Sequence, residues 1–69
     1  MYYAILNPSR NYQNVGVIDI EAETQESCVE AAESLGFDAA DASLEIIEGV
    51  KYLVLSKDGQ HIVIFARIS

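Results

Sequence analysis

The sequence has few of the residues that most often cross-link a chain or carry chemistry. Among 69 residues there is one cysteine, one histidine, one proline and no tryptophan. A single cysteine excludes a disulfide within the chain and fits a reducing cytosol. No apolar run approaches the roughly 18–20 residues of a membrane span. With 51% hydrophobic residues the chain is too apolar for a disordered tail, so we expect one folded domain over residues 1–69.

Positive charge is also scarce. Four Lys and Arg stand against eleven Asp and Glu, which gives a formal net charge of −7. Ten of the eleven acids lie between residues 19 and 48, a stretch that contains no Lys, Arg or His. Nucleic-acid phosphates and anionic membranes would repel such a chain, so neither is expected as a direct partner. An acidic block is most often a solubilising surface, and that interpretation stays beside any functional one.

Hydrophobic periodicity predicts the element order ββαβββ. The helix is expected at about residues 25–35, with Thr24 as its N-cap and Gly36 as its left-handed C-terminal residue. An Asp58-Gly59 pair predicts a two-residue hairpin turn. Strands are expected at residues 2–6, 15–22, 43–48, 50–56 and 60–68. The predicted fold class is therefore α+β, a four- to five-stranded antiparallel sheet with one helix on one face.

One side of the predicted helix is apolar and made of small residues. At about 100° per residue the clustered positions are Cys28, Ala31, Ala32 and Leu35. We expect this side to lie close against the sheet, with Phe37 closing the end of the core. A thiol at Cys28 would then be a small, inert core residue.

The other side of the helix carries Glu26, Glu30 and Glu33. Helix geometry places neighbouring carboxylates of this set roughly 5–6 Å apart, comparable with the phosphates along one DNA strand. A negative stripe of this kind can imitate nucleic acid and dock onto a basic groove of another protein. The candidate partner-binding acidic face also includes Asp19, Glu21 and Glu23.

The last two strands are apolar on both sides. One set of alternating residues should lie under the helix, and the other set has no predicted cover: Tyr52, Val54, Val63 and Phe65. An open patch with aromatic residues is typical of a self-association or partner surface. The alternative is that these strands curl so strongly that the second side is only partly open.

Nothing in the sequence predicts catalysis. His61, the only imidazole, is expected at the surface beside the hairpin turn, too isolated for a catalytic group. The chain has no Gly-rich phosphate loop, no cysteine pair and no Asp-rich calcium loop. We therefore predict a protein that is not an enzyme, with no catalytic residues, no metal and no cofactor.

Several segments resemble small phage-encoded anti-CRISPR proteins that inhibit type I systems. The similarity lies in YAILNPSRN at residues 3–11, then Asn14, Gly16 and IDIEA at residues 18–22, followed by an Ala-rich helix. The hairpin-rich second half, with its KDG turn at residues 57–59, is similar in plan to another inhibitor of this kind. About half of the chain is covered. Some relatives carry basic residues on the helix where this chain has acids, so no individual functional residue is transferred.

The resemblance implies a stoichiometric inhibitor that acts in the host bacterial cytoplasm. Its partner would be a subunit of a Cascade-type CRISPR effector, and binding would block recognition of target DNA. The alternative is a small interaction module, unrelated to CRISPR, that forms a homodimer or binds a protein partner through the apolar sheet side.

Overall fold

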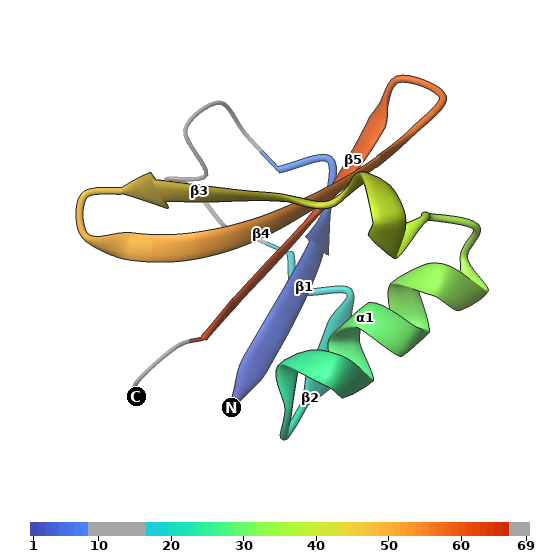
Figure 1. The fold of residues 1–69 in the computed structure, drawn as a ribbon. Coiled ribbons are helices and arrows are strands. Elements are labelled where there is room, and N and C mark those ends of the chain that lie inside the picture. Colours follow the sequence, from blue (N-terminus) through green and yellow to red (C-terminus); the bar gives the residue numbers. More distant parts are fainter. Residues whose placement is uncertain (9–16, 67–69) are drawn as a thin grey trace.

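Five antiparallel strands form one sheet in the order β2-β1-β5-β4-β3, and a helix packs on one side of it (Figure 1). This arrangement comes from a computed structural model that describes residues 1–8 and 17–66. The elements are β1 (Tyr2–Leu6), β2 (Ile20–Ala22), α1 (Gln25–Ser34), the short 3₁₀ helix η2 (Ala39–Asp41), β3 (Ser43–Ile47), β4 (Val50–Lys57) and β5 (Gln60–Ala66). The predicted α+β class and element order are confirmed.

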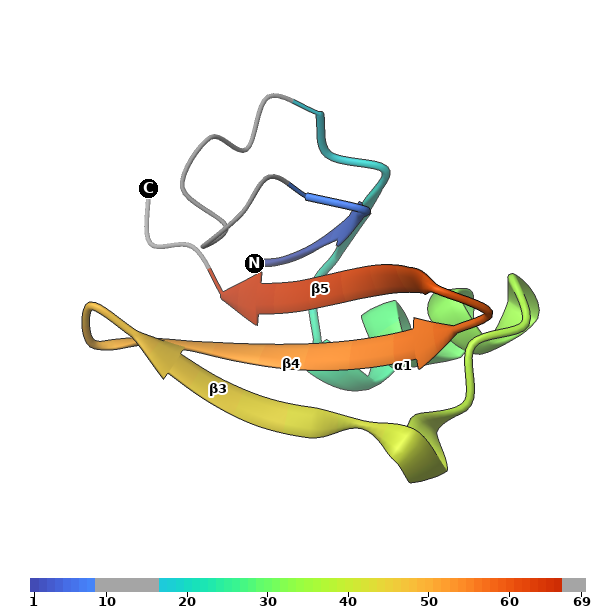
Figure 2. The same cartoon turned by 90° about the horizontal axis from the view of Figure 1, so that it is seen from above.

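Two tight turns set the register of the β3–β4–β5 meander, seen from above in Figure 2. Asp58 and Gly59 have φ of 47° and 80°, and Lys57 pairs with Gln60 across the turn. Positive φ at both central residues is the type I′ geometry, whose twist matches that of the flanking strands. Glu48 and Gly49 repeat this geometry between β3 and β4. The predicted Asp-Gly hairpin is confirmed, and a second hairpin of the same kind precedes it.

The second strand is shorter than the alternating pattern predicted. Of the expected range 15–22, residues 15 and 16 lie outside the described residues, and residues 17–19 are not strand. The reason is visible at Asp19, whose carboxylate accepts a hydrogen bond from Leu6 N–H at 2.7 Å. A side chain here takes the place of a main-chain ladder bond. The expected end of the last strand, residues 67 and 68, also lies outside the described residues.

The predicted capping residues at both ends of α1, Thr24 and Gly36, are confirmed. Thr24 Oγ1 accepts a hydrogen bond from Ser27 N–H at 3.1 Å. Beyond the last turn, Gly36 has φ of 99°, its N–H donates to Glu33 C=O, and Phe37 N–H donates to Ala32 C=O. These two bonds form a Schellman motif, which needs a left-handed residue at the glycine position.

The motif also decides which apolar residue enters the core at the end of the helix. Phe37 is 4% exposed and packs in the core, as predicted. Leu35, expected on the buried side, is 53% exposed, so that prediction is wrong. The helix ends one residue earlier than expected, and the turn that follows aims Phe37 inward instead of Leu35.

The core lies between α1 and one side of the sheet. Small residues allow the close approach: Ala4, Cys28 and Ala32 are fully buried. Leu55, Ile62 and Ile64 complete the contact from β4 and β5. The helix packs mainly on β1, β2 and β5, whereas the β3–β4 hairpin extends away from it (Figure 1). One half of this side of the sheet is therefore less covered than the other.

Candidate functional site

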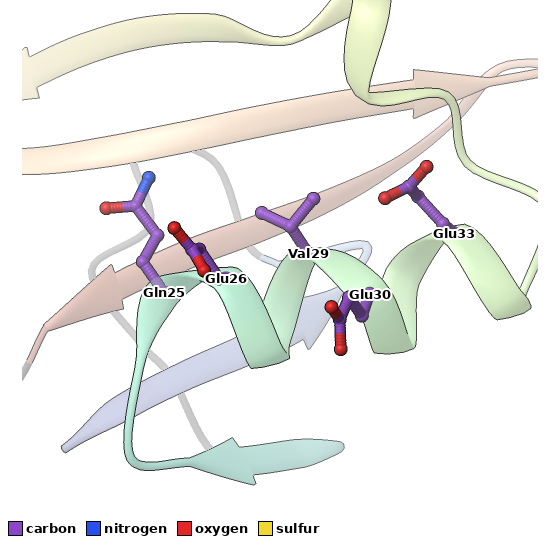
Figure 3. A pocket seen from close by; sticks show the side chains of 5 residues that line it. All are labelled: Gln25, Glu26, Val29, Glu30 and Glu33. Atoms are coloured by element: carbon purple, nitrogen blue, oxygen red, sulfur yellow. The ribbon is translucent and has the colours of Figure 1, made fainter.

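The predicted acidic stripe forms on α1. Glu26, Glu30 and Glu33 are all exposed and project from the helix (Figure 3). Together with Gln25 and Val29 they line an open hollow of about 540 Å³. The hollow is open to solvent and is bordered by three carboxylates and one apolar side chain.

The rest of the helix holds this array in place. Its opposite side is anchored by the fully buried Cys28 and Ala32, and the Thr24 cap fixes its first turn. The first and last turns of α1 contain no basic residue. The three carboxylates are therefore hydrogen-bond acceptors on a fixed helix, the arrangement that suits Lys or Arg side chains of a partner. Among the described residues, no group of three or more His, Cys, Asp and Glu is placed to hold a metal ion.

The other three predicted acids do not join this stripe. The Asp19 carboxylate bonds to the β1 main chain instead. Glu21 pairs with Tyr3, whose neighbour Ala4 packs under the helix, so Glu21 lies on the side of the sheet away from α1. Glu23 is exposed in the turn before the helix. The expected single acidic face is thus divided between two sides of the sheet.

The apolar side of the sheet opposite α1 is largely closed, which contradicts the expected open patch. Val54 is 5% exposed, Val63 is fully buried and Phe65 is 8% exposed, while Tyr52 is half-buried. Part of this burial comes from cross-strand packing. The Phe65 ring lies between the rings of Tyr3 and Tyr52, at centroid distances of 5.8 and 5.7 Å.

This closure removes the basis of the homodimer alternative in its predicted form. An apolar interface needs side chains that can be desolvated on binding, and these four are already largely shielded from water.

The two residues considered for reactivity lie where the sequence predicted. Cys28 is buried against the sheet, and burial raises the pKa of its thiol because the thiolate would lose its hydration. A raised pKa makes it a poor nucleophile. His61 is exposed next to the β4–β5 turn, and its main chain is bound by Asn7.

The structure exposes two apolar residues that were not predicted as functional, Leu44 and Ile46 on β3. They are 62% and 64% exposed. Leu44 pairs with Leu53, which pairs with Ile64, so this row lies on the same side of the sheet as α1. Alternation within residues 43–47 places both side chains on one side. The alternating pattern in the sequence therefore placed Leu44 and Ile46 on one side of the strand. It could not show that they are exposed, because that depends on which strands α1 covers.

Comparison with protein families, with curated proteins and with solved structures finds no match to this chain. In residues 1–8 and 17–66 no helix has the length and apolar character to cross a membrane.

Proposed function

We propose that this protein is a non-enzymatic inhibitor that occupies a basic surface of another protein with the acidic face of α1. The observation that carries the proposal is the exposed array of Glu26, Glu30 and Glu33 around the hollow on one rigid helix. Carboxylates at this spacing present charge to Lys and Arg side chains in the way that a phosphate backbone does. Long-range attraction would speed the encounter and make binding sensitive to salt.

The narrower form of the proposal is an anti-CRISPR function. The target is then a Lys- and Arg-rich DNA-binding surface of a Cascade-type effector in the host bacterial cytoplasm, and binding blocks recruitment of target DNA. This form is supported by the resemblance of residues 3–22 and 57–59 to type I inhibitors, together with the acidic array.

Charge-matched variants test both forms. One variant replaces the stripe with Glu26→Gln, Glu30→Gln and Glu33→Gln. Its control changes three exposed acids away from the stripe, with Glu21→Gln, Asp41→Asn and Glu48→Gln. Both variants remove three negative charges, so a difference between them reports position rather than net charge.

The first readout is binding of labelled target DNA by a purified type I effector complex. We expect wild type and control to block DNA binding, and the stripe variant to lose the block. If wild type has no effect, the CRISPR form fails. The broader form is then tested by affinity capture from a bacterial lysate at low and high salt. A partner that wild type and stripe variant retain equally at both salt concentrations contradicts it.

A further inference from the structure

The helix is too narrow to cover the whole side of the sheet on which it lies. Five strands at about 4.8 Å spacing span about 19 Å, whereas one helix with its side chains is about 10 Å wide. The α1 helix packs mainly on β1, β2 and β5. The uncovered part of this side is β3 and the adjoining part of β4 before Leu55, which is itself fully buried in the core (Figure 1).

A groove follows this uncovered part beside the helix. Its floor is mainly apolar, with Leu44 and Ile46 exposed on β3 and Leu53 half-buried on β4. Lys51, which pairs with Ile46, adds one positive charge to this side. A cavity of about 180 Å³ opens in the floor, and Gln25 lines both this cavity and the acidic hollow on α1. The two depressions therefore adjoin at Gln25 and form one groove, with a mainly apolar floor that includes Lys51 and an acidic wall on α1.

We propose that this groove binds an amphipathic helix of a partner protein, with its apolar stripe on the β3–β4 floor and Lys or Arg residues along the flank that faces α1. The proposal rests on the proposed function and specifies the partner element. Neighbouring helices pack 8–10 Å apart, a distance at which flanking side chains meet. Basic side chains of the bound helix would thus reach Glu26 and Glu33, while its apolar side chains cover Leu44 and Ile46.

Charge complementarity selects this occupant over a second copy of the chain. The helix of a second copy carries the same acids, and its apolar side is already buried through Cys28 and Ala32. Two acidic stripes would face each other across the groove, and like charges at that distance repel.

A model peptide tests the groove. The probe is a peptide of Leu and Lys, about 18 residues long so that a helix can form. Leu occupies positions i, i+3, i+4 and i+7 to form one apolar side, and Lys occupies the remaining positions. A peptide of the same composition in scrambled order is the control. We expect the amphipathic peptide to bind more tightly by calorimetry, and NMR shift changes to concentrate at the amides of Leu44, Ile46 and Leu53.

Variants of the chain separate the two parts of the groove. Leu44→Ser with Ile46→Ser should weaken peptide binding about tenfold or more, because the floor loses two buried apolar contacts. The matched control, Val17→Ser with Leu35→Ser, removes two residues of similar exposure, 67% and 53%, elsewhere and should change binding by about twofold at most. Retained folding is checked by circular dichroism.

The outcomes distinguish this inference from the proposed function. If the stripe variant loses binding but the Leu44 and Ile46 variant does not, the acidic face acts alone and the groove is refuted while the proposed function stands. If only the Leu44 and Ile46 variant loses binding, the acidic stripe does not contribute to binding. That result refutes both the groove as proposed here and the proposed function. Equal binding of the scrambled peptide, or a homodimer that the Leu44 and Ile46 changes abolish, also overturns the inference.

Discussion

Asn7 forms hydrogen bonds with both the N–H and the C=O group of the His61 main chain. Asn7 Oδ1 accepts a hydrogen bond from His61 N–H at 2.9 Å, and Asn7 N–H donates to His61 C=O at 2.7 Å. Asn7 adopts a left-handed conformation, with φ of 49°. One residue thus ends β1 and joins it to the start of β5 across 54 positions of sequence.

Replacing this residue should destabilise the fold. Asn7→Ala removes the side-chain oxygen that accepts the hydrogen bond from His61 N–H. It also places alanine in the left-handed region, which alanine adopts less readily than asparagine. Together these changes should lower the free energy of unfolding by about 2 kcal/mol. His61→Ala is the control, because it keeps the main-chain groups and removes only an exposed side chain, at about 0.5 kcal/mol or less. Urea unfolding measures both, and equal losses would refute the role of Asn7.

Asp19 and Glu21 should differ although both are exposed acids near the start of the acidic block. Asp19→Ala leaves Leu6 N–H without its carboxylate acceptor and should lower the free energy of unfolding by about 1 kcal/mol. Within residues 1–8 and 17–66 the Glu21 carboxylate accepts no such main-chain hydrogen bond, so Glu21→Ala should have a smaller effect. Similar unfolding curves for the two variants would contradict a structural role for Asp19.

The burial of Cys28 predicts a loss of stability at high pH. Burial raises the pKa of its thiol, so the unfolded chain releases this proton at a lower pH than the folded chain does. Above the ordinary thiol pKa the unfolded state binds fewer protons, and the free energy of unfolding falls as pH rises toward the folded pKa. Thermal unfolding across the alkaline range should show this fall in wild type and a smaller one in Cys28→Ala. Identical pH profiles would exclude the thiol as its source.

Gly36 should tolerate asparagine better than alanine. Its φ of 99° and the Lys57 side chain packed over it both disfavour an added Cβ. The Lys57 end is flexible and can move, so the backbone conformation decides, and Gly36→Ala should cost about 1–2 kcal/mol. Gly36→Asn should cost less because asparagine adopts the left-handed region more readily. Chemical unfolding of the two variants gives the comparison, and the opposite order would contradict this explanation.

Local signals predicted the elements that depend on a few neighbouring residues. Thr24, Gly36 and the Asp58-Gly59 pair each determine their own turn or cap through main-chain geometry, and the structure confirms all three. Residues 17–19 were mispredicted because the Asp19 side chain replaces a ladder bond, which alternation does not reveal. The acidic stripe followed from helical periodicity alone. The division of the other acids between two sides of the sheet depends on strand pairing across the fold, as does the exposure of Leu44.

The position of β3 at the end of the sheet has a consequence for solubility. An outer strand with exposed Leu44 and Ile46 is a template for indiscriminate strand addition, the first step of aggregation. Glu45 and Glu48 lie within and just after this strand, where charged gatekeeper residues oppose such stacking. The acidity of the chain then has a second effect, since ionised carboxylates keep copies apart in solution.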